Sequence, residues 1–89
     1  MESESEELTR ASEQSGQILG QARSQGVGVN ADSQMMDKLR EILSKIATVS
    51  HRPNLPWEVN LIESRDVNAF TIGGGKIFFY RGAFGNLID

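Results

Sequence analysis

The chain has 89 residues, of which 38% are hydrophobic and 24% are charged, and its net charge at pH 7 is −3. This length allows one small domain with a thin core, and no run of about 18 apolar residues is present to cross a bilayer. The acidic balance and the lack of clustered Lys and Arg argue against a nucleic-acid partner, and the absence of cysteine excludes disulfides and thiolate-bound zinc.

The beginning of the chain is acidic and poor in apolar side chains. Residues 1–16 are mostly Glu, Ser, Thr and Gln with one large aliphatic residue. Such a composition buries too little surface to offset the entropy of ordering, so we predict a flexible acidic lead-in. Between residues 14 and 24, Ile18, Leu19 and Ala22 lie at helical spacing and indicate a short helix.

A stronger helical pattern begins after a glycine-rich break. Asn30 or Asp32 can accept the free N–H groups at the start of this helix. Its apolar side chains recur at i, i+3, i+4 and i+7, which predicts a buried face. This face consists of Met35, Met36, Leu39, Ile42, Leu43 and Ile46. Pro53 and Pro56 then end helical structure.

Extended segments follow the second proline, because side chains there alternate as in a strand. Trp57, Val59 and Leu61 alternate with other residues and predict a strand with one well-buried face. Two more extended stretches, 67–72 and 76–80, surround three glycines and therefore predict a hairpin.

The glycines Gly73, Gly74 and Gly75 are predicted to form a structural turn. Three consecutive glycines are costly in entropy unless the backbone needs positive φ or close approach. They lack the spacing and the following helix of a phosphate-binding loop. We therefore predict an α+β fold, in which one or two N-terminal helices precede a small, three-stranded, mainly antiparallel sheet with a glycine-rich hairpin.

No residue of this chain is predicted to be catalytic or to bind a metal. A hydrolytic zinc centre needs three protein ligands, commonly with two histidines on one helix. The chain has a single histidine, His51, which we interpret as a solvated loop residue. A catalytic triad drawn from Ser50 or Ser64, His51 and Asp66 lacks the strand-to-helix elbow of such enzymes. The carboxylates that flank the strands are typical of a solvated face.

One stretch carries a more specific signal. Residues 67–82 read Val-Asn-Ala-Phe-Thr-Ile-Gly-Gly-Gly-Lys-Ile-Phe-Phe-Tyr-Arg-Gly. They closely resemble the segment just upstream of the zinc site in the CAAX-protease, HtpX-like and Oma-like zinc metallopeptidases. The Arg-Pro-Asn-Leu-Pro-Trp-Glu-Val segment before the first strand is also similar, so the resemblance covers about residues 17–89.

The resemblance implies that residues 17–89 are an incomplete gluzincin-type zinc metallopeptidase domain behind the lead-in at residues 1–16. Members of this family continue into a helix that bears His-Glu-x-x-His, which is absent here. We therefore expect no cofactor in this chain, with zinc bound only by the complete parent domain, and no activity of the chain alone. By resemblance the parent acts on proteins in the bacterial periplasm or at a membrane, in protein quality control.

The resemblance also implies a substrate-binding strand formed by Asn68, Ala69 and Phe70. Asn68 would offer its side-chain amide and Ala69 its carbonyl to the backbone of an extended peptide. Alternatively, Asn68 only caps a turn after Asp66, and Phe70 and Ile72 fill the core.

Two further functional hypotheses remain. The chain is either a self-sufficient, non-catalytic module whose edge strand captures extended peptides or a second copy of itself, or a degenerate regulator of an active relative. No residue favours the regulator.

Overall fold

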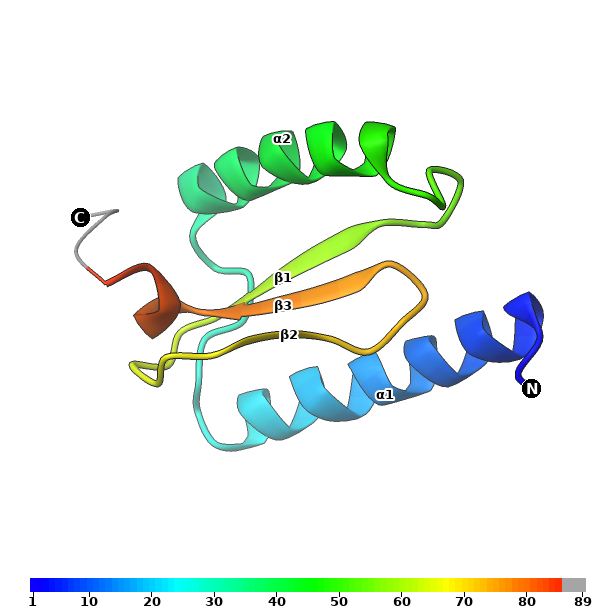
Figure 1. The fold of residues 1–89 in the computed structure, drawn as a ribbon. Coiled ribbons are helices and arrows are strands. Elements are labelled where there is room, and N and C mark those ends of the chain that lie inside the picture. The colour runs from blue at the N-terminus through cyan, green and yellow to red at the C-terminus, as the bar shows by residue number, and fades with distance from the viewer. Residues whose placement is uncertain (86–89) are drawn as a thin grey trace.

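The computed structural model describes residues 1–85, which form a sheet with one helix on each side (Figure 1). The elements in chain order are α1 (Glu4–Ser24), α2 (Ser33–Val49), β1 (Glu58–Ile62), β2 (Ala69–Thr71), β3 (Lys76–Tyr80) and a 3-10 helix, η1 (Arg81–Phe84). The predicted α+β fold and the hairpin at residues 73–75 are confirmed. Residues 86–89, including Leu87 and Ile88, lie outside the described part of the chain.

None of the helices in this part of the chain has the length and apolar character needed to span a bilayer.

Helix α1 begins near the N-terminus because Ser3 caps it. The Ser3 hydroxyl accepts the N–H of Glu6, and the Glu6 carboxylate accepts the N–H of Ser3, which makes a capping box. Small side chains at Ala11, Ser15 and Ala22 are buried against the rest of the molecule. Their small size lets the helix lie close to the sheet.

The structure differs from the prediction of a flexible segment at residues 1–16, because residues 4–16 belong to α1. The physical reason lies in polar contacts together with the burial of Ala11 and Ser15 on the sheet side of the helix. Besides the capping box, Arg10 donates through Nη1 to the carbonyl of Ile72, 62 residues away in the sequence. Composition alone does not reveal such contacts. The division of the chain into a lead-in and a domain stays a prediction.

Helix α2 packs on β1 and supplies most of the core. Of the two predicted caps, Asp32 is the N-cap, since its Oδ1 accepts the N–H of Met35 at 3.0 Å. The buried cluster between this helix and the sheet consists of Met35, Met36, Leu39, Leu43, Val59 and Leu61. The predicted burial of Ile42 and Ile46 is wrong, because these side chains are 54% and 48% exposed. They lie on a flank of α2 that the three strands do not cover.

The strand order is β1-β3-β2, so the last strand lies in the middle. β1 pairs with β3 in parallel, from Glu58↔Lys76 to Ile62↔Tyr80, whereas β2 pairs with β3 in antiparallel fashion. The sheet is therefore mixed, and the predicted mainly antiparallel arrangement is wrong in this respect. The reason is that residues 63–68 carry the chain past the position that β3 later fills, so β1 and β2 are not neighbours.

Arg81 joins the ends of three elements on one side of the molecule. Its Nη2 donates to Oδ2 of Asp32 at 2.7 Å and to Oε1 of Glu63 at 2.7 Å, and its Nε donates to Oε2 of Glu63 at 3.0 Å. The carboxylate of Glu63 first, and then that of Asp32, raises the pKa of Arg81. This charged cluster fixes the end of β3 against the start of α2 and the end of β1.

Candidate functional site

Strand β2 is an outer strand whose free side is formed by Ala69 and Thr71. The carbonyl of Asn68 accepts the N–H of Tyr80 at 2.9 Å, and Phe70 pairs with Phe78. The backbone N–H and C=O groups of Asn68 and Phe70 therefore point toward β3. Because neighbouring residues alternate in an antiparallel ladder, Ala69 and Thr71 turn their N–H and C=O groups outward. Both residues are exposed. Four backbone groups are thus aligned to receive another strand.

The outer edge of β1, in contrast, is paired at its C-terminal end by the linker between the helices. Val29 forms an antiparallel bridge with Ile62. Asn30 makes two hydrogen bonds with Leu61. The N–H of Asn30 donates to the Leu61 carbonyl at 2.8 Å, and its Oδ1 accepts the Leu61 N–H at 2.7 Å. Asn30 adopts a positive φ of 54°, which turns the chain away after this contact. Of the two outer strands, β2 therefore has the more open edge.

The predicted substrate-binding residues lie together at the start of β2. Asn68 is exposed immediately before the strand, and Ala69 begins it. Phe70 is half-buried, with its ring stacked on Phe78 at a centroid distance of 5.0 Å and edge-on to Tyr80 at 6.2 Å. The phenyl ring thus packs on the face of the sheet. Roles in binding substrate stay predictions for all three residues.

The glycine turn has the backbone that the sequence requires. Gly73, Gly74 and Gly75 have φ values of 90°, 61° and 79°, in the region that favours glycine. A Cβ atom on Gly74 would lie 2.7 Å from the Cβ of Ala11, so α1 also needs a glycine there. The predicted structural turn is confirmed.

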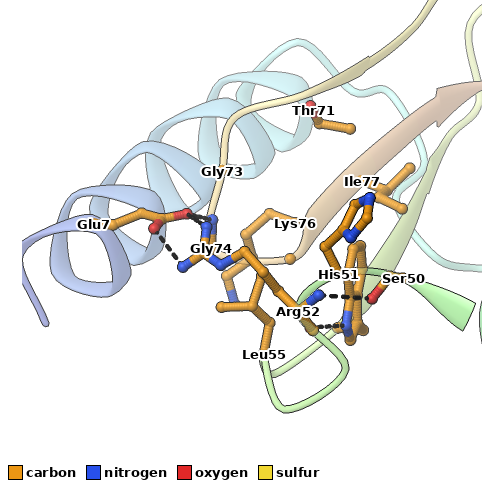
Figure 2. A pocket seen from close by; sticks show the side chains of 12 residues that line it. Glu7, Ser50, His51, Arg52, Leu55, Thr71, Gly73, Gly74, Lys76 and Ile77 are labelled. Carbon is orange, nitrogen blue, oxygen red and sulfur yellow. Dashed lines mark hydrogen bonds and ion pairs between the residues drawn. The ribbon is translucent and has the colours of Figure 1, made fainter. Parts of the chain in front are cut away.

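Glu7 of α1 holds this turn against the loop that precedes β1 (Figure 2). Its Oε2 accepts the N–H of Gly74 at 2.7 Å, and its two oxygens accept Nη1 and Nη2 of Arg52 at 3.1 and 2.7 Å. The guanidinium of Arg52, and next the N–H of Gly74, lowers the pKa of Glu7 below its usual range. Only 15% of the Glu7 side chain is exposed, so the charged contact is partly shielded from water.

A pocket of about 290 Å³ opens beside this contact, at the turn end of the hairpin (Figure 2). Its walls include Glu7, Arg52, Leu55, Trp57, Thr71 and Ile77. The indole N–H of Trp57 donates to the carbonyl of Arg52 at 3.1 Å, which fixes the ring. His51 lies at the pocket and is exposed, as predicted for a loop residue.

The side chains in residues 1–85 do not fit a zinc centre. Within this range no three His, Cys, Asp or Glu residues gather closely enough to hold a metal ion. Catalytic zinc is typically held by three such ligands.

Sequence reasoning missed three residues that shape the site. The composition around Glu7 predicts a flexible lead-in, and the sequence around Asn30 predicts only a helix cap. Thr71 was placed in an extended stretch without a side being assigned to its backbone. The alternation along residues 67–72 was the one available signal for Thr71, because the strand's outward groups follow from it. For Glu7 the partner residues are distant in sequence, so no local pattern indicates them.

Residues 33–89 match the family model described as Peptidase family M48. The matched range includes α2, the sheet and η1, whereas α1 precedes it. No match was found among curated proteins or among solved structures.

Proposed function

Because the chain belongs to peptidase family M48, we propose that it forms the substrate side of a zinc-dependent metalloendopeptidase domain. The observation that carries this proposal is the open edge of β2 in a sheet whose other edge is paired around Leu61 by the linker between the helices. An exposed edge binds extended peptides through main-chain hydrogen bonds, which tolerate many substrate sequences. This tolerance suits an endopeptidase.

In this proposal, the backbone of an extended peptide pairs with Ala69 and Thr71. The side-chain amide of Asn68 reaches the same peptide, and the small side chain of Ala69 leaves room for it. Each hydrogen bond contributes about 0.5–1.5 kcal/mol net, so four of them alone support binding in about the millimolar range. Tighter binding requires side-chain contacts.

We further propose that the zinc ligands of the complete domain come from residues outside this chain, on a helix with His-Glu-x-x-His. The flank of α2 exposes Ile42, Ile46 and Val49, and the first two line a shallow apolar pocket with Phe79 of β3 and Phe84 of η1. An apolar surface of this kind suits a covering helix. The chain alone is then inactive, and the residue pattern at 67–82 favours an HtpX-like or Oma-like parent in envelope protein quality control.

Peptide titration of the isotope-labelled chain tests the strand pairing. We expect the amide resonances of Ala69 and Thr71 to shift on addition of an extended peptide, while that of Leu61 on the covered edge stays unchanged. A control peptide with N-methyl groups on alternate residues lacks the required donors and should not bind. Shifts confined to Leu61, or equal binding of the methylated peptide, would contradict the proposal.

Zinc stoichiometry of the purified chain tests the proposal that the zinc ligands lie outside this chain. We expect no tight one-to-one binding and no cleavage of an unfolded protein substrate, because the ligand set is lacking. Tight stoichiometric zinc with proteolysis would show that the chain is a complete enzyme.

A non-catalytic, self-associating module is the second candidate. The exposed side chains of Ile42, Ile46 and Val49, together with the open edge of β2, favour it.

A further inference from the structure

The pocket beside the glycine turn is continuous with the open edge of β2 through Thr71. Thr71 lines the pocket and is also one of the two β2 residues with outward backbone groups. It pairs with Ile77 of β3, which lines the pocket too and packs against the core cluster on the α2 side. The side chains of Thr71 and Ile77 therefore lie on the α2 side of the sheet.

A peptide paired with β2 would bring one side chain to this pocket. Residues directly opposite each other in adjacent antiparallel strands turn their side chains to the same face, with Cβ atoms about 4.5–5.5 Å apart. The peptide residue opposite Thr71 therefore places its side chain on the α2 side of the sheet, at the mouth of the pocket. The two neighbouring peptide residues face the α1 side instead.

The charges of the pocket are already balanced by the protein itself. Arg52 is paired with Glu7 at 2.7 Å, and Lys76 is paired with Glu58 at 3.1 Å. The Trp57 indole N–H is bonded to a backbone carbonyl. The apolar walls formed by Leu55, Trp57 and Ile77 remain for a ligand, and a charged group placed among them would lose water without gaining a partner.

We propose that this pocket takes a large uncharged side chain, aromatic or long aliphatic, from the peptide residue opposite Thr71. The inference rests on the proposed pairing of a peptide with β2 and names the substrate class: extended peptides with a bulky apolar residue at that position. It also explains how a short edge strand gains affinity beyond its few backbone bonds.

Trp57 is the single tryptophan of the chain, so its fluorescence reports on the pocket directly. A series of otherwise identical extended peptides carries Phe, Leu, Ala or Glu at one central position. We expect the Phe and Leu peptides to bind about 10-fold or more tightly than the Ala and Glu peptides, because a large apolar side chain is buried. Only the first two should change the Trp57 emission.

A pair of loop variants provides the matched control. Leu55→Glu places a carboxylate in the wall of the pocket, whereas Asn54→Glu adds the same charge at the exposed neighbouring position. We expect Leu55→Glu to reduce the preference for Phe over Ala to less than about 3-fold, since the apolar wall is lost. Asn54→Glu should keep the preference of the unmodified chain.

The results separate the pocket from the strand pairing. If all four peptides shift the Ala69 and Thr71 resonances with equal affinity, the pocket proposal is overturned and the pairing stands. If no peptide shifts these resonances, the pairing is overturned, and the pocket is tested with N-acetylphenylalaninamide. A shift of the Trp57 indole N–H by this probe, and not by N-acetylaspartate, supports the apolar pocket, and its absence overturns it.

Discussion

At the scale of single residues, Glu7 connects three parts of the molecule through one carboxylate. It belongs to α1, and it binds the backbone of the glycine turn and the guanidinium of Arg52 in the loop before β1. Asp32 has a similar position at the other end of the molecule, where it caps α2 and binds Arg81. Both contacts require the ionised acid, which makes them sensitive to pH.

The stability of the fold should therefore decrease in acid. The pKa of Glu7 is lowered from 4.5, mainly by Arg52, and that of Asp32 is lowered from 3.8, first by the Met35 N–H and then by Arg81. A depressed folded-state pKa stabilises the fold above the ordinary value, and this contribution is lost as the pH falls through the folded-state pKa. We expect the urea midpoint to fall steadily below about pH 4.5.

Two substitutions test whether the Glu7 carboxylate contributes to this pH dependence of stability. Glu7→Gln should flatten part of this pH dependence, because the carboxylate that titrates is removed. Glu13→Gln, at an exposed position of the same helix, should leave the curve unchanged. Identical pH profiles for both variants would argue against a role for Glu7.

Gly74 and Gly20 differ in the space available for an added Cβ atom, which allows a second prediction. Gly74→Ala should destabilise the fold by at least about 1–2 kcal/mol, because the new Cβ meets Ala11 and the residue keeps a left-handed backbone. Gly20→Ala should instead stabilise it by about 0.5–1 kcal/mol, since Gly20 is a helical residue of α1 and nothing lies within 4 Å of that Cβ. Urea unfolding measures both, and equal changes in the two variants would contradict the close approach of α1.

At the scale of elements, the linker between α1 and α2 acts as a partial fourth strand. Asn30 satisfies both outward groups of Leu61, one through its backbone and one through its side chain. Because a side-chain oxygen replaces a backbone carbonyl as the acceptor, the chain can leave the sheet after Asn30 and begin α2 at Ser33, behind the N-cap Asp32. The C-terminal half of the β1 edge is thereby paired with very few residues.

Replacing Asn30 separates these roles. Asn30→Ala should destabilise the fold by about 1–2 kcal/mol, because the Leu61 N–H loses its partner and alanine disfavours a positive φ. Asn30→Gly retains the backbone conformation and should cost less. In both variants, hydrogen exchange at the Leu61 amide should become faster, and unchanged protection of that amide would show that Asn30 is not its partner.

Sequence patterns predicted the elements of this fold better than their contacts. The helix of α2, the strand β1 and the glycine turn follow from local properties, and the structure has all three. The predicted single buried face of β1 is wrong, because Asn60 and Ile62 are buried as well as Val59 and Leu61. The parallel pairing of β1 with β3 was missed because pairing depends on which strand fills the middle of the sheet. The exposure of Ile42 and Ile46 was missed because periodicity defines a stripe but not the width of the surface it covers.

In the candidate site, too, local sequence indicates single segments but not the contacts between them. The resemblance indicates residues 68–70, and in the structure Asn68 precedes the outer strand β2 while Ala69 and Phe70 belong to it. The pocket beside them is assembled from the N-terminal helix, a proline-rich loop and the hairpin. Such an assembly depends on contacts between distant residues, which a single sequence does not display.

At the scale of the whole molecule, one side carries an apolar surface in contact with water. Ile42, Ile46 and Val49 follow each other along α2 and are 54%, 48% and 84% exposed. Lys38 and Lys45 lie on the same helix, and Lys45 forms an ion pair with Glu41. A surface of this kind promotes association when no other segment covers it.

We therefore predict that the chain associates weakly with itself at millimolar concentration. Ile46→Lys should reduce this association, because a charge at the centre of the apolar surface must be desolvated in the contact. Thr48→Lys introduces the same charge at another exposed position of α2 and should have little effect. Sedimentation of the three proteins measures the difference, and a strict monomer of the unmodified chain would contradict the prediction.

The central place of β3 has a consequence for how the protein is made. During synthesis β1 and β2 leave the ribosome first, but each has only β3 as a full partner in the sheet. Until residues 76–80 arrive, the nascent chain holds helices without a sheet between them. We therefore expect the three-stranded sheet to form only when β3 takes its place between β1 and β2.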